Sequence, residues 1–511
     1  MKIESFSYKK ISIYCALAAF LVLSLQLLRS YFLCEHQFIY STDDTYIHMA
    51  IARNLAYYKV WSTNQDFFTS SSSSFLYTIL LAVGFKFFGN HQYYPYVLNF
   101  VPYFLLFVVI YKYYAEQISK QKFLAINIFL VSIFPLPLFA MEHSLHVLFL
   151  LLFLLEFDQF IAGSKNMLLL LFLGFMLTML RYESMFILCS AFLILLYHKK
   201  IVPAFLLMLI GFSPIIIYGM YSVQHGSYFL PNTLVTKGNF IEPNLQGILA
   251  FIIKVVFDFT VNIHFTIYII LVGIYFWKQH FKTTHWSFLI ILLTTGAHLL
   301  FAGVLHFYRY EAYLIVPIVL YFIAYFYNDE QALYLSKSKL SSVLKTVFIV
   351  SIVFRLAFNI WVIQMAPKNI YEQQIQFSKF LKKYYDKQAV LVHDIGYLAF
   401  STDVKIYDIA GIATLDVAAT KTKKFHFKPG FIDQQQEKYG FKIGVFYDIF
   451  ANNGMPKTWI KAGEWKINHN RVCGLSKINF YAVDSVQYFI LKQQLKDYEP
   501  SVNKNVEQKI Y

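Results

Sequence analysis

The chain has 511 residues, of which 58% are hydrophobic and 14% are charged. A soluble protein carries about 25% charged residues, so this composition excludes an ordinary soluble domain and indicates an integral membrane protein. The formal net charge is +15. The lysines mostly flank apolar segments, which favours a role in membrane orientation over nucleic-acid binding.

The four cysteines do not form a recognisable framework. Cys15 and Cys189 lie inside apolar segments, which leaves Cys34 and Cys473 as the candidate pair outside them. Sequence spacing alone does not bring two cysteines within disulfide distance.

The first apolar segment follows Lys2, Lys9 and Lys10 and covers residues 11–33. It is long enough to cross the roughly 30 Å hydrocarbon core of a bilayer, and no clear small-residue cleavage site follows it. It therefore predicts a retained helix whose N-terminus lies in the cytoplasm.

Further candidate spans follow at 93–112, 123–140, 144–162, 167–181, 184–198, 201–222, 249–277, 286–305, 312–328 and 342–364. The lysines between them fall in alternate loops, which are the cytoplasmic loops if the N-terminus is inside. This agreement requires that the short apolar run 75–88 lie at the membrane interface. The sequence thus predicts a mainly helical, polytopic protein of about eleven spans, in which 167–198 is either a hairpin or one kinked helix.

The character of the sequence changes after Met365, where charged residues become frequent and no further span follows. Short β-like runs alternate with helical stretches, which is typical of an α/β domain. The runs are 389–392, 443–446 and 480–483, and one of the helical stretches is 371–385.

Two domains are therefore expected. The first is a membrane domain over 1–365, whose first outer loop is 34–92. The second is a C-terminal α/β domain over 366–511, which an odd number of spans places outside the cytoplasm.

The unusual polar residues of the membrane domain gather on the side that this threading makes extracytoplasmic. They are Asp43, Asp44 and Asp66 in the first outer loop, Glu142 with His143, Arg181 with Glu183, Leu230–Thr233 with Lys237, and Tyr308–Glu311. Ionisable residues at a membrane are costly and usually functional. Convergent polar groups at one face predict a binding or catalytic cavity there.

Each of these features has a plainer interpretation. Asp43 and Asp44 are good caps for a helix that begins near Thr45, although a cap needs one carboxylate and the chain has two. Arg181 and Glu183 are two residues apart, so on a regular helix they would face different directions and could both be interfacial.

The remaining features are also open to structural interpretations. Arg309 would suit a side chain that reaches a lipid headgroup, and Pro231 with its neighbours would suit a helix terminator. His48 and His143 could complete a metal site with the acids, but no compact ligand spacing supports one. The serine run 70–74 predicts a polar loop ahead of the interfacial run.

Taken together, the motifs resemble the GT-C fold glycosyltransferases, of the bacterial group that includes the terminal arabinofuranosyltransferases. The resemblance covers about residues 10–420 and keeps the order of the family. The matching elements are Asp43-Asp44-Thr45-Tyr46, Arg53-Asn54-Leu55, Ser70–Tyr77, Met141-Glu142, Arg181-Tyr182-Glu183, Pro231-Asn232-Thr233 with Lys237, Arg309-Tyr310, Asp394-Ile395-Gly396 and Asp408–Gly411.

The chain departs from that family at two motifs. Tyr182 and Ser184 stand where the family has Pro and Gly, and the serine run lacks the Gly and Pro of the corresponding family segment. Both departures fall near the expected acceptor and donor contacts.

The resemblance implies an inverting glycosyltransferase that moves a sugar from a polyprenyl-phosphate donor to a cell-envelope glycan or lipid acceptor. The reaction would take place at the outer face of the bacterial cytoplasmic membrane. The resemblance implies Asp44, or else Asp43, as general base, with membrane lipids as further partners and no nucleic acid. It implies that Arg181, Lys237 and Arg309 bind the donor phosphate and that Glu142, Glu183, Asn232 and Tyr310 contact substrate. It assigns no metal ligand and no cofactor, and a divalent-cation requirement stays open.

A transporter or flippase of a lipid-linked or polar substrate is the alternative. Such proteins usually place ionisable groups near the bilayer midplane, often in two related halves. This chain shows no internal repeat, and its charges lie at one face. A third interpretation, a membrane anchor with an outer binding domain, gives the Asp pair no role.

Overall fold

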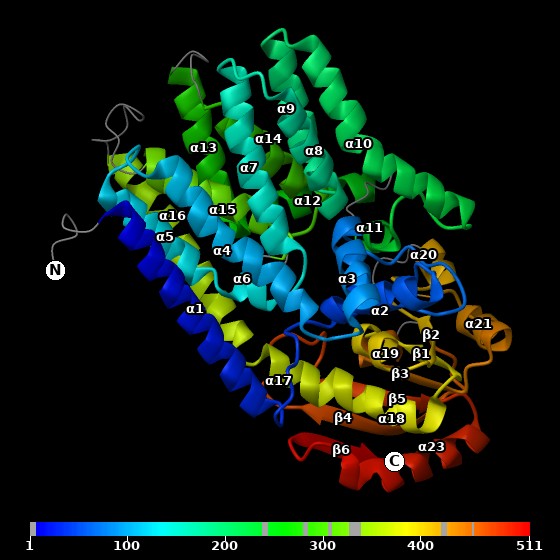
Figure 1. Ribbon diagram of the computed structural model, residues 1–511. Coiled ribbons are helices and arrows are strands. Elements are labelled where there is room, and N and C mark those ends of the chain that lie inside the picture. The colour runs from blue at the N-terminus through cyan, green and yellow to red at the C-terminus, as the bar shows by residue number, and fades with distance from the viewer. Residues whose placement is uncertain are drawn as a thin grey trace. The chain divides into compact units, whose positions relative to one another are not determined.

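The computed structural model describes residues 7–237, 244–278, 285–304, 309–326, 339–420, 427–451 and 454–511. The protein is mainly helical, with one small sheet near the C-terminus (Figure 1). The chain forms two compact units. The helical unit contains 1–25, 96–218 and 238–361, and the sheet-bearing unit contains 26–95, 219–237 and 362–511.

The helical unit consists of apolar helices of very different lengths. In chain order they are α1 (Tyr8–Leu33), α4 (Tyr94–Tyr114), α5 (Lys120–Ser132), α6 (Pro135–Leu138), α7 (His143–Ile161), α8 (Met167–Leu180), α9 (Ser184–Tyr197), α10 (Ile201–Gln224), α12 (Leu245–Val261), α13 (Ile263–Lys278), α14 (Ser287–Phe301), α15 (Ala312–Tyr321) with the π-helical turn Phe322–Phe326, and α16 (Lys339–Ile363). Four helices continue beyond the bounds of this unit: α1, α4, α10 and α16.

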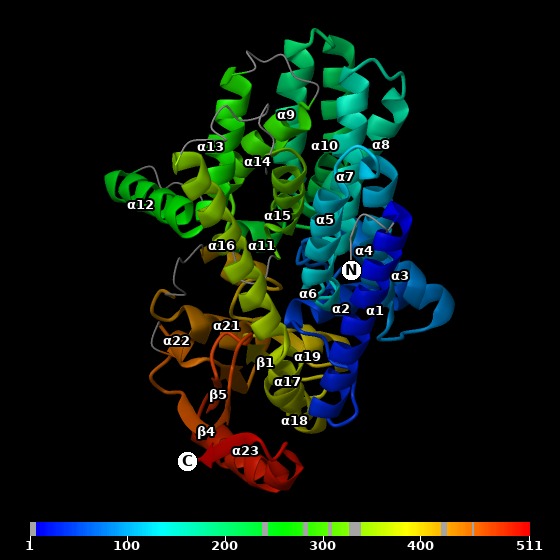
Figure 2. The same cartoon turned by 90° about the vertical axis from the view of Figure 1, so that its left-hand side faces the viewer.

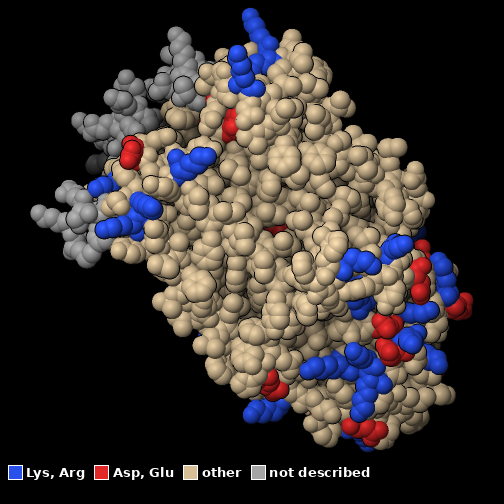
Figure 3. All heavy atoms as spheres, in the orientation of Figure 1, with Lys and Arg blue, Asp and Glu red and all other residues tan. Residues whose placement is uncertain are grey.

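Many of these helices are long and apolar enough to cross a membrane. Among the described residues six helical segments meet that condition, in α1, α4, α5 with α6, α7, α10 and α16. Five further apolar helices are shorter. On α1, six large side chains are 51–61% exposed, as lipid-facing side chains would be: Leu17, Phe20, Leu21, Leu25, Leu28 and Phe32. Figure 3 shows the same pattern as broad uncharged surface over the helical unit, while charged side chains gather over the sheet-bearing unit.

Two segments of the helical unit resolve questions that the sequence left open. Residues 167–198 form two helices, α8 and α9, separated by Arg181–Glu183. The segment predicted as one span at 249–277 is also two helices, α12 and α13, which meet at a bend of 84°. At the break, the Asn262 side-chain amide donates to the carbonyl of Asp258 (2.9 Å). The predicted total of eleven spans stays a prediction.

The sheet of the second unit is mixed. Its strands are β1 (Ala389–Val392), β2 (Lys405–Asp408), β3 (Ile443–Phe446), β4 (Ile460–Ile467), β5 (Lys477–Ala482) and β6 (Val506–Ile510), in the order β2-β1-β3-β5-β4-β6. The first three are parallel to one another, whereas the other pairings are antiparallel. The strands predicted at 389–392 and 443–446 are confirmed, and the third predicted run lies mostly within β5.

Helices from three separate stretches of the chain belong to the sheet-bearing unit. They are α2 (Asp43–Tyr58), α3 (Phe75–Phe88), α11 (Asn232–Lys237), α17 (Ala366–Ile370) with the π-helical turn Tyr371–Ile375, α18 (Gln376–Tyr385), α19 (Gly396–Ser401), α20 (Leu415–Thr420), α21 (Phe431–Tyr439), α22 (Asp448–Ala451) and α23 (Ser485–Tyr498). The last of these packs on β4 and β5 (Figure 2).

The first outer loop is built into this unit rather than standing apart from it. Helix α2 packs against α3 and α19, and its residues from Thr45 to Ala52 are buried. The predicted domain boundary at 365/366 stays a prediction, but the compact unit that holds 362–511 also holds 26–95.

The edge strand β2 is covered by a side chain of that loop. The Oδ1 atom of Asn64 accepts from the backbone N–H of Ile406 (3.0 Å), and its Nδ2 donates to the carbonyl of the same residue (3.4 Å). The amide therefore imitates a neighbouring strand at an edge that would otherwise expose unpaired backbone groups.

Replacing this amide should weaken the sheet-bearing unit. We expect Asn64→Ala to lower the free energy of unfolding by about 1–3 kcal/mol, because two buried backbone groups lose their partner. Gln65→Ala is the matched control, since the Gln65 amide donates to the Asp403 carboxylate (2.6 Å) at an exposed position. Thermal unfolding of the full chain in detergent would measure both, and equal effects would contradict the edge-covering role.

Candidate functional site

The predicted site residues fall into two groups, one in each unit. Glu142, Arg181, Glu183, Arg309 and Tyr310 lie in the helical unit. Asp43, Asp44, Asn232 and Lys237 lie in the sheet-bearing unit. The Lys237 side chain is outside the described part of the structure, as is Tyr308.

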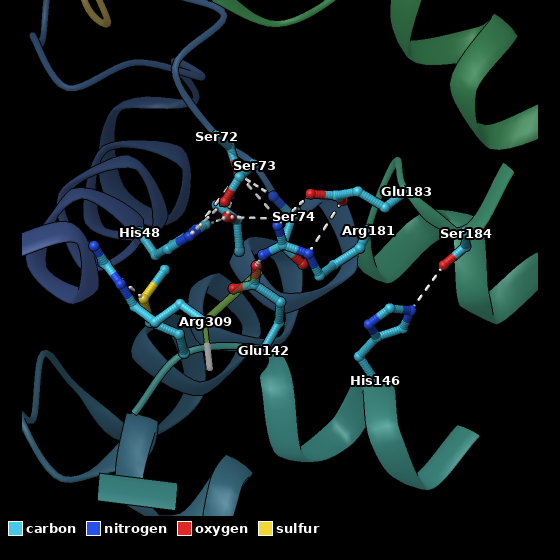
Figure 4. Close-up of polar contacts among 12 residues, drawn as sticks. His48, Ser72, Ser73, Ser74, Glu142, His146, Arg181, Glu183, Ser184 and Arg309 are labelled. Carbon is cyan, nitrogen blue, oxygen red and sulfur yellow. Dashed lines mark hydrogen bonds and ion pairs between the residues drawn. The ribbon is translucent and has the colours of Figure 1, made fainter. Parts of the chain in front are cut away.

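In the helical unit, Arg181 lies between two carboxylates. Its Nη1 is 2.5 Å from Glu142 Oε1, and its Nη2 is 2.6 Å from Glu183 Oε1 (Figure 4). Its Nε donates to the second oxygen of Glu183 (3.2 Å), so that contact is bidentate. Arg181 and Glu183 meet because Arg181 ends α8 in an extended conformation (φ −151°, ψ 139°) and the chain is not helical between them.

The three side chains form a buried cluster. Arg181 is 3% exposed and Glu142 is 0% exposed, so both side chains are enclosed by the protein. One guanidinium faces two carboxylates, which gives the ionised trio a net charge of −1. The ring of Tyr310 lies 5.5 Å from the guanidinium carbon, which is within the range of cation–π contacts.

A layer of buried polar residues supports this cluster, and the sequence did not single it out. The Ser184 hydroxyl donates to the carbonyl of Leu177 (2.9 Å). His146 Nε2 lies 2.8 Å from Ser184 Oγ. Since the serine hydrogen is already used, His146 donates from Nε2. His146 follows Glu142 by four residues, one helical turn, and that spacing was the available signal.

The second arginine of the helical unit has different surroundings. Arg309 is half-buried, and its Nη1 lies 3.9 Å from the Met141 sulfur. The neighbouring Glu311 is fully buried and forms an ion pair with Arg355 of α16. The Glu311 charge is thus balanced by an arginine that lies about forty residues further along the chain.

In the sheet-bearing unit, Asp43 and Asp44 form the first turn of α2. The helix begins at Asp43, two residues before the predicted start. Asp43 Oδ2 accepts from the N–H of Gly396 (2.6 Å), and Oδ1 accepts from that of Tyr397 (2.9 Å). Asp43 therefore caps a helix, as the plainer interpretation held, but the helix is α19 rather than its own.

The contact between α2 and α19 is reinforced at its other end. Arg53 Nη1 donates to the carbonyl of Phe400 (2.8 Å), near the C-terminus of α19. A carboxylate at the start of α19 and a guanidinium at its end both complement the dipole of that helix. A Cβ atom at position 396 would lie 2.0 Å from the Asp43 carbonyl oxygen, so the close approach requires glycine there.

A polar network lies behind Asp43. His393 and Asp394 follow β1, with Nδ1 and Oδ1 2.9 Å apart. Asp394 Oδ2 accepts from Tyr447 (2.5 Å) and from the Gln374 amide (2.6 Å). Burial, together with the nearby Asp394 charge, raises the pKa of Asp43 to about 7. Burial acts to raise the pKa of Asp394, but His393 beside it holds that pKa below the ordinary value.

The other acid of the predicted outer-domain motif has a structural role. The two Asp408 oxygens accept from the N–H groups of Ala410 and Ala413 (both 2.8 Å), which shapes the loop after β2. Burial raises the pKa of Asp408 to about 6.

The same loop is tied to the serine run and to α11. Ser71 Oγ (3.0 Å) and the Asn232 amide (3.2 Å) both donate to the carbonyl of Ile412. The N–H of Asn232 donates to the carbonyl of Ser70 (2.8 Å). The run 70–74 is a loop ahead of α3, as predicted, and four of its five serines are buried. The serines are needed because a buried loop must supply its own hydrogen-bond partners.

His48 is one of the side chains that the serine run contacts. Its Nδ1 lies 3.0 Å from Thr78 Oγ1, and its Nε2 lies 3.3 Å from Ser73 Oγ (Figure 4). Across the described ranges of the chain, no three His, Cys, Asp or Glu side chains come together as a metal site. All four cysteines are described and unpaired, so the candidate Cys34–Cys473 disulfide is not formed.

Comparison with known proteins adds a match to one family model. A family model described as a domain of unknown function (DUF8728) matches residues 368–488, which run from α17 into α23 and include His393, Asp394 and Asp408. No curated protein matches the chain. No solved structure matches it either.

Breaking the Arg181 cluster should be strongly destabilising. We expect Arg181→Met to cost about 3–5 kcal/mol of unfolding free energy, because it leaves two buried carboxylates without their cation. Lys466→Met is the control, since Lys466 and Glu507 form an exposed pair at 3.0 Å and should change stability by about 0–1 kcal/mol. Thermal unfolding in detergent compares the two, and a small effect of Arg181→Met would contradict the buried cluster.

The acids of the sheet-bearing unit should make its stability depend on pH. Asp43 and Asp408 have raised pKa values in the folded protein, against about 3.9 for an unfolded Asp. Between the unfolded and folded pKa values, the folded state holds more protons than the unfolded state. Stability therefore falls as pH rises from about 4 to about 7. The lowered pKa of Asp394 affects stability only below about pH 4, where its stabilising contribution is lost as pH falls.

The measurement is the melting temperature of the full chain between about pH 5 and pH 8. We expect it to decline with pH in the wild type and to decline less in Asp43→Asn. Asp66→Asn, which changes an exposed acid of the same unit, should keep the wild-type slope. An unchanged slope in Asp43→Asn would contradict the assignment.

Proposed function

We propose that this protein is an inverting glycosyltransferase that uses a polyprenyl-phosphate sugar as donor and a cell-envelope glycan or lipid as acceptor. The observation that carries the proposal is the division of roles within the Asp pair of α2. Both oxygens of Asp43 accept from backbone N–H groups of α19. These bonds fix the first turn of α2, in which Asp44 is the next residue. A catalytic base must be held in place, and Asp43 supplies that constraint for its neighbour.

In the proposed reaction Asp44 is the general base. Its carboxylate takes the proton of an acceptor hydroxyl, and the acceptor oxygen attacks the anomeric carbon of the donor sugar. The bond between that carbon and the phosphate oxygen breaks with inversion, and polyprenyl phosphate leaves with the electron pair. Such a base must lie within hydrogen-bond reach of the proton that it removes.

Cations stabilise the leaving phosphate in this proposal. We assign that role first to Arg309 and Lys237. Arg181 is already bonded to two carboxylates, so its charge is largely compensated and we treat it as a positioning residue. Glu142 and Glu183 then act by orienting Arg181, and Asn232 by holding the loop after β2.

The proposal includes the finer points of topology. The chain would be a GT-C type protein of about eleven spans in the bacterial cytoplasmic membrane, with the N-terminus inside and the sheet-bearing unit outside. The apolar helices support membrane integration. The donor would reach the outer face through the lipid.

One observation favours a second candidate, a transporter or flippase. The helices α12 and α13 are bent by 84° at a break, and transporters often bind substrates at interrupted helices. The break also has a structural explanation, because Asn262 bonds both the carbonyl of Asp258 and Arg355 Nη1. We therefore rank this function second.

The test is sugar transfer in membranes that contain the protein, with a panel of labelled polyprenyl-phosphate sugars. We expect Asp44→Asn to lower transfer by about 10²–10⁴-fold, as loss of a general base does. Asp43→Asn should lower the melting temperature as well, because α19 loses an acceptor. Asp497→Asn, at an exposed acid of α23, is the control and should keep full transfer.

Wild-type transfer in Asp44→Asn would rule out this base. If the wild-type protein transfers none of the sugars but moves a lipid-linked substrate across sealed vesicles, the transporter is the correct function.

A further inference from the structure

A cavity of about 580 Å³ lies within the sheet-bearing unit, away from the Asp pair. It is lined by residues of the first outer loop, of the 225–232 segment, and of β2, α20 and α21. Its size is in the range of small-molecule binding sites. None of the residues assigned to the proton transfer or to the phosphate lines it.

Three residues that line the cavity carry a buried polar atom with no hydrogen-bond partner among the described residues. They are Ser227 Oγ, Asn232 Oδ1 and the Tyr407 hydroxyl. Asn232 is 1% exposed and Tyr407 is 3% exposed. Leaving a buried polar group unbonded costs about 1–3 kcal/mol, so three around one cavity indicate a ligand rich in hydrogen-bonding groups.

The charges around the cavity are balanced in pairs. Lys438 Nζ lies 2.9 Å from Asp416 Oδ2, and Lys405 Nζ lies 3.5 Å from Asp66 Oδ2. Each lysine already has a carboxylate, which argues against a phosphate or another strong anion as ligand. The Asp416 carboxylate also accepts from the Tyr439 hydroxyl (2.9 Å), which fixes that ring at the cavity.

The aromatic lining completes the pattern. Tyr439 is 39% exposed, and its ring centroid lies 5.0 Å from that of the buried Tyr407. A fixed, partly exposed ring beside hydroxyl, amide and carboxylate groups suits a ligand with both hydroxyls and apolar C–H faces.

We propose that this cavity binds a neutral oligosaccharide, and that it holds a segment of the acceptor glycan. The first statement stands by itself, whereas the second rests on the proposed function. Tyr439 packs against a sugar ring, Asp416 accepts from its hydroxyls, and Ser227, Asn232 and Tyr407 complete the hydrogen bonds.

The experiment measures glycan binding to the purified full chain in detergent, without donor. The probes are linear trisaccharides of mannose, glucose, galactose and arabinose, with trigalacturonate and inorganic phosphate as anionic comparisons. We expect saturable binding of at least one neutral probe. Tyr439→Ala should weaken it at least about tenfold, and Asp416→Asn should weaken it severalfold.

Phe489→Ala is the matched control. Phe489 is 69% exposed on α23 and does not line the cavity, so its loss should leave affinity unchanged. The melting temperature of each variant is measured beside its affinity. A variant that binds weakly but melts at the wild-type temperature has lost binding and not folding.

Three results would overturn the proposal: no saturable binding of any neutral probe, a preference for trigalacturonate or phosphate, or unchanged affinity in both cavity variants. Because no donor is present, this outcome is independent of the transfer assay. Asp44→Asn should bind the trisaccharide normally, so glycan binding without transfer would reject the transferase and keep the carbohydrate site.

Discussion

The carboxylate of Asp43 joins two parts of the chain that are more than 350 residues apart, and the sheet-bearing unit depends on that contact. It accepts two N–H groups at the start of α19, while Arg53 from the same helix holds the other end of α19. All three bonds involve a charged group, and together they satisfy both ends of α19, which would otherwise be buried without a partner. Glycine at 396 is required because any side chain would collide with Asp43.

This contact changes how the first outer loop is understood. A loop that carries a catalytic carboxylate must be held still, yet loops generally are mobile. Here the loop is built into the same compact unit as the sheet: Asn64 covers the edge strand β2, and the serine run fills the space between α2 and the loop after β2 with hydrogen bonds. The Asp pair is therefore placed by a scaffold rather than by its neighbours in the sequence.

In the helical unit the dominant electrostatic constraint is different: charged side chains lie largely away from water. An isolated buried arginine would be prohibitively costly. Arg181 is stabilised by two carboxylates, and behind them Ser184 and His146 bond one another. Glu311 and Arg355 form a second such ion pair, with one carboxylate and one guanidinium. Each of these charges has an opposite charge beside it, which offsets the cost of removing it from water. This pairing also makes Arg181 better suited to positioning than to binding a phosphate.

The sequence by itself determined the membrane character, the approximate position of most helices, two of the strands and the residues that became the candidate site. Those features depend on local composition, and apolar runs or alternating residues report them directly. It could not determine that the helix over 245–278 is interrupted at Asn262 or that the serine run is buried. It also could not determine that Arg181 and Glu183 meet in the non-helical turn between α8 and α9. It also could not show the roles of His146 and Asn64 or the cavity lined by Tyr407 and Tyr439. Those depend on contacts between residues far apart in the chain, which only the tertiary structure decides.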